Sequence, residues 1–216
     1  MKRAAIAHPR LLLVLIALGF GALALAGGLA ALAYRQALGE PQTITREAEA
    51  LGAALEGARW APSRAEGPVL YLVGFRTCPA CMAYKESEGP WLAASGVQVR
   101  SIIFAPRGQA NPAEEAAAAE LALSRSGRFL DDWFAAPDLA AFAAARALPP
   151  PDVAPERAAA LAANHATVEA LERILKANGA AIAYPALFWR KDGAWRLMLG
   201  YSPEKAARVR AELGVP

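Results

Sequence analysis

Cysteine and histidine are scarce in this chain of 216 residues, and their scarcity excludes several kinds of site. The only cysteines are Cys78 and Cys81, and the only histidines are His8 and His165. A structural zinc site usually has four cysteine or histidine ligands, and His8 lies far from the other three in the chain. A haem attachment motif has histidine directly after its second cysteine, where this chain has Met82. We therefore expect no metal and no other cofactor.

An excess of positive charge is missing from most of the chain, although the formal net charge is +3. Lys2, Arg3 and Arg10 account for all of that excess, and the remainder has 20 basic and 20 acidic residues. Nucleic-acid binding proteins usually have a basic stripe, often interleaved with aromatic residues, and no such stripe occurs here. We therefore predict no nucleic-acid partner.

Charge is absent altogether from residues 11–33, LLLVLIALGFGALALAGGLAALA. As a helix rising about 1.5 Å per residue, this run is long enough to cross a hydrocarbon core of roughly 30 Å. Three basic residues lie within residues 1–10, so the positive-inside rule places 1–10 in the cytoplasm and exports the remainder. The run therefore predicts a single transmembrane helix that acts as a signal-anchor.

A cleaved signal peptide is the alternative interpretation of this run. Ala31-Leu32-Ala33 fits a small-x-small cleavage site, and cleavage near Ala33 would leave a soluble exported protein. The hydrophobic region of a signal peptide usually has about 7–15 residues, which favours an anchor for this longer run. Both interpretations predict that the residues that follow are exported.

The exported part divides into a predicted linker and a predicted domain. Residues 34–65 contain glycine and proline around an alanine- and glutamate-rich stretch, which predicts a helical stalk or linker. Residues 66–216 contain short β-branched and aromatic runs near both ends, the pattern of buried strands. Between these runs, about residues 109–179 are rich in alanine, leucine and glutamate at helical spacing, which predicts a helical insertion.

The two cysteines lie between two predicted strands. PVLYLVGF, residues 68–75, and VQVRSIIF, residues 97–104, both have the composition of buried strands. The segment between them predicts a helix with Pro79 in its first turn, where a missing N–H costs nothing, and with an interruption at Gly89-Pro90. The sequence near the end, AYPALFWRKDGAWRLMLGY, predicts a hairpin followed by a terminal helix.

The motif CPAC, residues 78–81, permits two functions once metal binding is set aside. A structural disulfide is one, but it would close so short a loop that it would constrain the unfolded chain very little. Thiol–disulfide exchange is the other, because Cys78 precedes a predicted helix whose free N–H groups and dipole stabilise a thiolate. Cys81 lies three residues later on the same face and is suitably placed to resolve a mixed disulfide on Cys78.

The motifs together resemble a thioredoxin fold, carried by VLYLVGFRTCPACMAYKE, VQVRSIIF and the hairpin with its terminal helix. The insertion resembles that of the periplasmic thiol–disulfide oxidoreductases of the Dsb group. NHATVEALERILKANGAAIAYPALFWRKDG is most similar to the segment before the cis-proline of the DsbC/DsbG catalytic domain. Over about residues 66–214, the resemblance implies that Cys78 attacks, Cys81 resolves, and Tyr184 and the cis-proline Pro185 bind substrate.

Three departures from this family qualify what the resemblance implies. Residues 34–65 are too few for the dimerisation domain of DsbC and DsbG, which argues against an isomerase dimer. Tyr184 is bulkier than the residue that usually precedes the cis-proline. The strand before the cysteines has no acidic residue to deprotonate Cys81, so Glu86, Glu88 or a water chain would have to do so.

The expected architecture is an α/β, thioredoxin-like fold with a helical insertion, preceded by a transmembrane helix. The expected function is thiol–disulfide exchange with exported proteins in the periplasm of a bacterium, by an enzyme anchored in the inner membrane and served by a membrane redox partner. A dedicated reductant for cytochrome maturation or other exported cysteine pairs is an alternative. A thioredoxin-like binding or assembly module with an idle CxxC motif is the non-enzymatic alternative.

Overall fold

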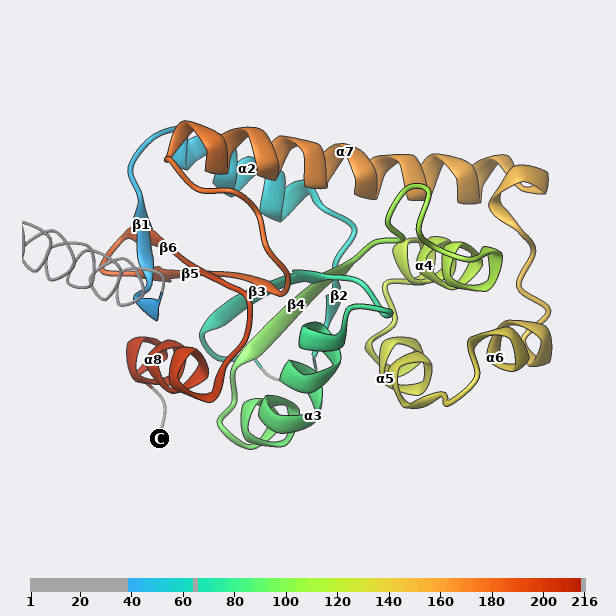
Figure 1. Ribbon diagram of the computed structural model, residues 1–216, viewed down its shortest axis with the longest axis horizontal. Coiled ribbons are helices and arrows are strands. Elements are labelled where there is room, and N and C mark those ends of the chain that lie inside the picture. Colours follow the sequence, from blue (N-terminus) through green and yellow to red (C-terminus); the bar gives the residue numbers. More distant parts are fainter. Residues whose placement is uncertain (1–38, 64–65, 215–216) are drawn as a thin grey trace, which may run out of the picture. The chain divides into compact units, whose positions relative to one another are not determined.

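A mixed sheet of six strands forms the centre of the part described by the computed structural model, residues 39–63 and 66–214. Its strand order is β1-β6-β5-β3-β4-β2 (Figure 1). Strands β3 and β4 are parallel, and every other neighbouring pair is antiparallel. The strands are β1 (Gln42–Ile44), β2 (Ala61–Pro62), β3 (Val69–Gly74), β4 (Gln98–Ile103), β5 (Ala186–Lys191) and β6 (Ala194–Leu199).

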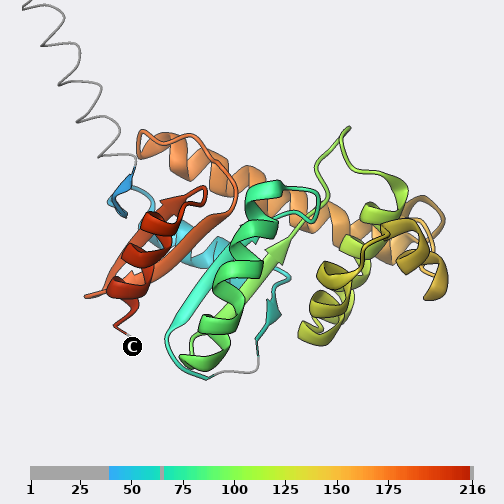
Figure 2. The same ribbon diagram turned by 60° about the horizontal axis from the view of Figure 1, so that its bottom comes forward.

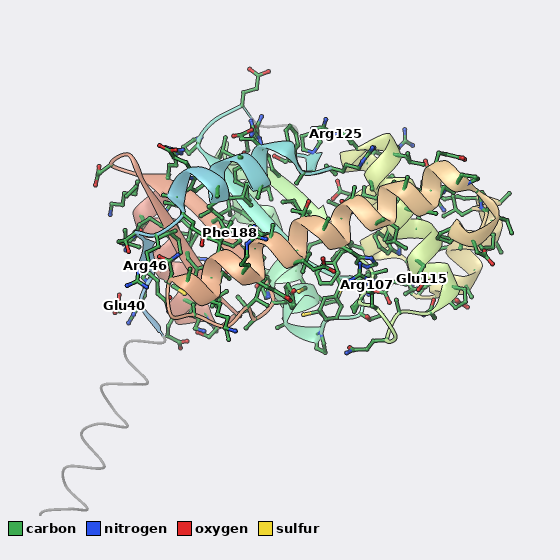
Figure 3. The ribbon with its side chains drawn as sticks, turned by 90° about the horizontal axis from the view of Figure 1, so that it is seen from above. Glu40, Arg46, Arg107, Glu115, Arg125 and Phe188 are labelled. Carbon is green, nitrogen blue, oxygen red and sulfur yellow. The ribbon has the colours of Figure 1, made fainter. Side chains whose placement is uncertain are left out.

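Helices cover both faces of this sheet, so the domain has three layers (Figures 1 and 2). Helices α3 (Pro79–Ala94) and α8 (Pro203–Leu213) lie on one face, whereas α2 (Ala48–Gly57) and α7 (Pro155–Ala177) lie side by side on the other. Figure 3 shows the second face with α7 running along its length. Each face has its own cluster of buried apolar side chains, and the burial of these two clusters stabilises the fold.

The parallel strands β3 and β4 are joined through α3, as the sequence predicts. The predicted interruption at Gly89-Pro90 is wrong, because α3 continues through Pro90 to Ala94. Tyr84 and Leu92 lie on either side of the proline and are both buried. The packing of both halves on the sheet thus compensates for the one backbone hydrogen bond that a proline removes.

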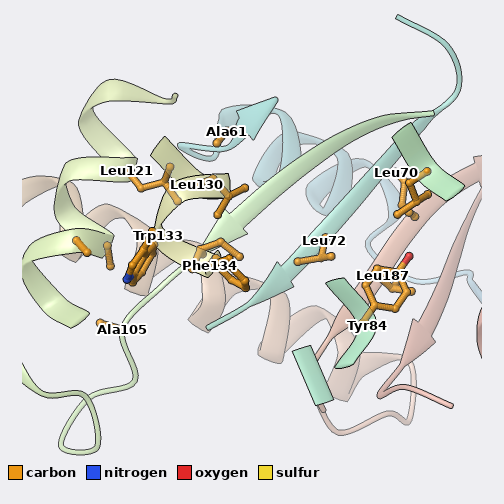
Figure 4. Close-up of a cluster of buried hydrophobic side chains, with 14 of the residues drawn as sticks. Ala61, Leu70, Leu72, Tyr84, Ala105, Leu121, Leu130, Trp133, Phe134 and Leu187 are labelled. Carbon is orange, nitrogen blue, oxygen red and sulfur yellow. The ribbon is translucent and has the colours of Figure 1, made fainter. Parts of the chain in front are cut away.

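The insertion between β4 and β5 is helical, as predicted. It comprises α4 (Pro112–Ser124), α5 (Gly127–Ala135), α6 (Leu139–Ala145), the 3₁₀ turn η1 (Pro151–Val153) and α7. Asn111 caps α4 by accepting a hydrogen bond from the N–H of Glu114. Trp133 of α5 is fully buried in the cluster that continues beneath α3, with Phe134 beside it (Figure 4). The insertion and the α3 side of the sheet therefore share one core.

Residues 34–65 contain a helix, α2, as predicted, but the prediction that they form a stalk or linker is wrong for β1, α2 and β2, which belong to the domain. Strand β1 pairs with β6, and β2 pairs with β4, so both edges of the sheet come from this segment. Leu51 and Leu55 of α2 are fully buried, and α2 packs against α7. These leucines are four residues apart and form an apolar stripe, which the abundance of alanine and glutamate obscured.

The predicted transmembrane span, residues 11–33, lies outside the described residues. Within 39–63 and 66–214, no helix combines the length and apolar character needed to cross a bilayer.

The predicted hairpin and terminal helix are both present. Asp192 and Gly193 form the turn between β5 and β6, and both have a positive φ, as a two-residue hairpin turn of this kind requires. Ser202 caps α8 by accepting a hydrogen bond from the N–H of Lys205. The hairpin places Pro185, which immediately precedes β5, next to the end of β3.

Candidate active site

Cys78 is the N-cap residue of α3, at the point where the chain leaves β3. Its backbone is extended, with φ −75° and ψ 114°, and Pro79 begins the helix. The N–H of Cys81 donates a hydrogen bond to the Sγ of Cys78, at 3.2 Å. An N–H group in the first turn of a helix, directed at sulfur, stabilises the thiolate more than the thiol. The geometry therefore favours Cys78 as the nucleophile.

Cys81 is more deeply buried, one helical turn further along α3. Cys81 is 2% exposed to solvent, compared with 6% for Cys78. Burial is the main cause that raises the pKa of the Cys81 thiol, and its contact with Cys78 raises that pKa further. Both cysteines are free thiols. The buried thiol of Cys81, with its raised pKa, suits a resolving cysteine, whereas the sulfur of Cys78 is the one that receives an N–H at the beginning of the helix.

The peptide bond between Tyr184 and Pro185 is cis, as the resemblance implied. The carbonyl oxygen of Tyr184 faces the Sγ of Cys78, at 4.0 Å. The N–H of Gly200 donates a hydrogen bond to the carbonyl oxygen of Pro185, at 2.8 Å. The structure therefore brings together all four residues predicted for the site, Cys78, Cys81, Tyr184 and Pro185, although they come from segments about a hundred residues apart in the chain.

Three aromatic rings lie beside this pair of segments. Phe75, Phe104 and Tyr184 contact one another with centroid distances of 5.2 to 5.5 Å. Phe104 is buried, whereas Phe75 and Tyr184 are partly exposed. Their tilted and edge-to-face arrangements are favourable for aromatic pairs. The bulky Tyr184 is therefore accommodated by rings from the ends of β3 and β4.

Neither acidic residue proposed for Cys81 forms a hydrogen bond with it in the described part of the chain. Glu88 is buried and forms an ion pair with Arg210 of α8. Glu86 is exposed on the surface of α3. A cavity of about 690 Å³ between α3, α5 and β4 reaches Cys81, and Ser101 and Lys85 are among the polar residues that line it. A cavity of this size with polar groups in its wall can hold water.

A buried acid that the sequence did not indicate lies close to the cysteines. Glu114 of α4 is fully buried, and its carboxylate accepts hydrogen bonds from the N–H and the hydroxyl of Thr77, at 3.2 and 3.0 Å. Burial is the main cause that raises the pKa of Glu114, although its bonds to Thr77 and the charge of Arg76 oppose the shift. The two partners are 37 residues apart, so no local pattern indicates the contact.

A metal centre is not formed by the residues that the structure describes. No group of three or more histidine, cysteine, aspartate or glutamate side chains is arranged there to bind an ion. His165 of α7 instead contacts the carbonyl oxygen of Ala105 through its Nε2, at 2.6 Å, and so helps to join α7 to the segment after β4.

Comparisons with known proteins support the fold. No protein-family model matches the sequence, and no curated protein sequence matches it. Among solved structures, BcfH of Salmonella enterica Typhimurium has a TM-score of 0.58 and 14% identity, covering 93% of this chain and 92% of that one. A periplasmic thioredoxin-like protein from the same serovar has a TM-score of 0.52 and 16% identity, covering 80% and 99%. At such low identity these likenesses confirm the thioredoxin-like fold alone.

Proposed function

We propose that this protein is a thiol–disulfide oxidoreductase that acts on exported proteins through Cys78 and Cys81. The observation that carries the proposal is the hydrogen bond from the Cys81 N–H to the Cys78 sulfur at the beginning of α3, next to the carbonyl of Tyr184. It supports a role for Cys78 as the attacking thiolate, Cys81 as the resolving thiol, and Tyr184 and Pro185 as the substrate-binding residues.

The reaction begins when the Cys78 thiolate attacks one sulfur of a client disulfide. The client S–S bond breaks, its second sulfur leaves as a thiolate, and a mixed disulfide links the client to Cys78. Cys81, as a thiolate, then attacks the Cys78 sulfur and releases the remaining client thiolate. Two electrons pass to the client, and a Cys78–Cys81 disulfide forms. The reverse sequence oxidises a pair of client thiols.

Cys81 must lose a proton before it can resolve the mixed disulfide. Its raised pKa keeps it protonated, and so prevents it from competing with Cys78 for the client. Since Glu88 forms an ion pair with Arg210, the cavity that reaches Cys81 can hold the water that carries this proton to solvent. This arrangement corresponds to the water-chain alternative among the three that the sequence left open.

A client segment would bind in extended form across the cis-proline. The carbonyl of Tyr184 lies beside the nucleophile and is suitably placed to accept a backbone N–H from such a segment. Proline at the next position has no N–H that would compete for a partner. Backbone recognition of this kind suits an enzyme that acts on many exported proteins.

The proposal also places the protein at the inner membrane, with its cysteines in the periplasm. Residues 11–33 support an anchor in the inner membrane of a bacterium, with the cysteines in the periplasm and a membrane protein as redox partner. One structural neighbour is a periplasmic thioredoxin-like protein, which supports this compartment.

The test is to equilibrate the purified protein with glutathione and to follow the Cys78–Cys81 pair by mass spectrometry. We expect reversible formation of the disulfide, with a reduction potential of about −120 mV for an oxidase or about −270 mV for a reductase. Cys81→Ala should accumulate a mixed disulfide with glutathione disulfide or with an unfolded protein that contains a disulfide, and Cys78→Ala should not. A Cys81→Ala protein that forms no mixed disulfide would overturn the proposal.

A further inference from the structure

The two residues before the nucleophile are held by the helical insertion. Thr77, which directly precedes Cys78, is bound by Glu114 through both its N–H and its hydroxyl, and the hydroxyl lies 3.0 and 3.1 Å from the two carboxylate oxygens. These bonds fix the backbone and the side chain of Thr77 together. Because Thr77 and Cys78 share a peptide bond, whatever fixes the first restricts the second.

Arg76 provides a second attachment to the same insertion. Its guanidinium donates to the carbonyl oxygens of Trp133 and Ala136, at 3.3 and 2.8 Å, at the C-terminal end of α5. A cation is favoured there, because these carbonyls carry the negative end of the helix dipole. Arg76 also reaches the sulfur of Met82 in α3, at 3.1 Å. The loop between β3 and α3 is thus bonded to α4 and α5.

Glu114 lies in the first turn of α4, where a glutamate side chain usually bonds within its own helix. It is the third residue of α4 after the N-cap Asn111, where a glutamate commonly reaches back to the N–H of the N-cap residue. Here its carboxylate is directed instead at Thr77 of another segment. The carboxylate is fully buried, and among the described residues no cation lies within 4.0 Å of it, although the charge of Arg76 acts on it from farther away. Burial of an ionised carboxylate is costly, so stability alone does not favour this residue.

We propose that Glu114 is a positioning residue for thiol–disulfide exchange, which holds Cys78 through Thr77 so that its sulfur receives the N–H of Cys81. The inference rests on the proposed function and deepens it, because it makes the helical insertion a control on the reactivity of the nucleophile. Glu114 does not contact the reacting sulfurs, and its effect passes through the loop. The bond from Cys81 N–H to sulfur, at 3.2 Å, is the contact that depends on this position.

The charge of Glu114 and its effect on the position of Cys78 should change the stability of the Cys78 thiolate in opposite directions. Variants of Glu114 can therefore separate the two effects. A negative carboxylate near the cysteine disfavours the thiolate, whereas correct placement of the sulfur at the helix N-terminus favours it. Glu114→Gln removes the charge but retains the size of the side chain and a carbonyl oxygen that can accept from Thr77. Glu114→Ala removes both the charge and the acceptor.

The experiment measures two properties of each variant. The first is the rate at which iodoacetamide alkylates Cys78 at pH 7 in a Cys81→Ala background. The second is the equilibrium of the Cys78–Cys81 pair with glutathione. If placement dominates, Glu114→Ala lowers the alkylation rate at least threefold. It also shifts the equilibrium at least threefold towards the disulfide, which is about 14 mV for a two-electron couple. Glu114→Gln restores most of both properties.

Glu115→Ala is the matched control, because Glu115 is the next residue of α4 and makes no hydrogen bond to the loop in the described structure. It should leave both properties unchanged. Thr77→Val removes the hydroxyl that bonds to Glu114, and it should lower the alkylation rate as Glu114→Ala does. It also keeps the proposal testable if Glu114→Ala fails to fold.

Two results would overturn the proposal. One is a folded Glu114→Ala protein, or in its absence a folded Thr77→Val protein, in which alkylation and equilibrium are unchanged. The other is faster alkylation in both Glu114→Ala and Glu114→Gln, which would show that the charge matters and the placement does not. Alkylation needs no disulfide exchange, so it tests Glu114 even if the wild-type protein does not equilibrate with glutathione, the result that would refute the proposed function.

Discussion

The sulfur of Cys81 packs directly against the backbone of Gly74, the last residue of β3. A Cβ atom at Gly74 would lie 2.8 Å from this sulfur and 3.6 Å from the Cβ of Cys81. Contacts under 3.0 Å essentially never occur for real Cβ atoms. The place of the resolving cysteine therefore depends on the absence of a side chain at the end of the strand.

We predict that Gly74→Ala destabilises the protein and slows the resolution of mixed disulfides. Overpacking of this kind costs about 1–3 kcal/mol, which urea denaturation would measure as a lower free energy of unfolding. Displacement of Cys81 should increase the amount of protein trapped as a mixed disulfide with glutathione. Gly57→Ala is the control, because a Cβ at Gly57 has no neighbour within 4 Å. Equal stability of Gly74→Ala and wild type would contradict the packing argument.

The two cysteines should differ strongly in their reaction with alkylating agents. Burial raises the pKa of Cys81, so at neutral pH it is largely protonated, while Cys78 receives a hydrogen bond at its sulfur. We expect iodoacetamide at pH 7 to modify Cys78 in the Cys81→Ala variant at least about tenfold faster than Cys81 in the Cys78→Ala variant. Mass spectrometry of timed samples measures both rates, and equal rates would remove the distinction between attacking and resolving thiols.

A partly buried ion pair between β6 and α8 should make stability depend on pH. Arg196 of β6 donates to both carboxylate oxygens of Glu212 in α8, at 2.8 and 2.7 Å, and also to the carbonyl of Pro41. The hydrogen bonds from Arg196 hold the pKa of Glu212 below its ordinary value. This pair therefore contributes stability above the unfolded pKa of about 4.3, and that stability is lost as the pH falls through the lower folded pKa.

We predict that Glu212→Gln lowers the free energy of unfolding by about 1 kcal/mol at pH 7 and by much less near pH 3. Urea denaturation at the two pH values measures the difference. Glu169→Gln is the control, since Glu169 pairs with Arg107 at an exposed site where ion pairs contribute little. A loss of the same size at both pH values would show that the charge of Glu212 is not responsible.

The ring of Tyr184 should stabilise the substrate-binding segment through its two aromatic neighbours. Tyr184→Ala removes its contacts with Phe75 and Phe104, and aromatic pairs contribute about 0.5–1.5 kcal/mol each beyond the area that they bury. We expect a loss of about 2 kcal/mol or more in thermal or urea unfolding. Tyr184→Phe keeps both ring contacts and should remain within about 0.5 kcal/mol of wild type. If both variants lose the same stability, the hydroxyl rather than the ring is important.

Local patterns predicted much of this fold and most of the residues in the candidate site. The apolar run of β3, the CPAC motif at a helix start and the Asp192-Gly193 turn each carry their own physical signal within a few residues. Pro90 was misjudged because a proline weakens a helix by a fixed amount, whereas the burial of Leu92 and Tyr84 that opposes it depends on the sheet.

The linker was misjudged for a related reason. Strand β1 has only three residues, and it is stabilised by pairing with β6 and by the hydrogen bond from Arg196 to Pro41, more than 150 residues away. No window of sequence contains both partners of such a contact. Strand β2, with two residues, is held in the same way by β4.

The sequence by itself determined which sulfur would lie at the start of a helix, because strand, CPAC motif and helix follow one another directly along the chain. It also determined that Tyr184-Pro185 precedes the final hairpin. Only the tertiary structure decided that Tyr184 faces Cys78, that Gly74 makes room for Cys81, and that Glu114 holds Thr77. Helix starts and turns arise from neighbouring residues, whereas these contacts join distant segments that meet only when the sheet and its helices bury their apolar faces together.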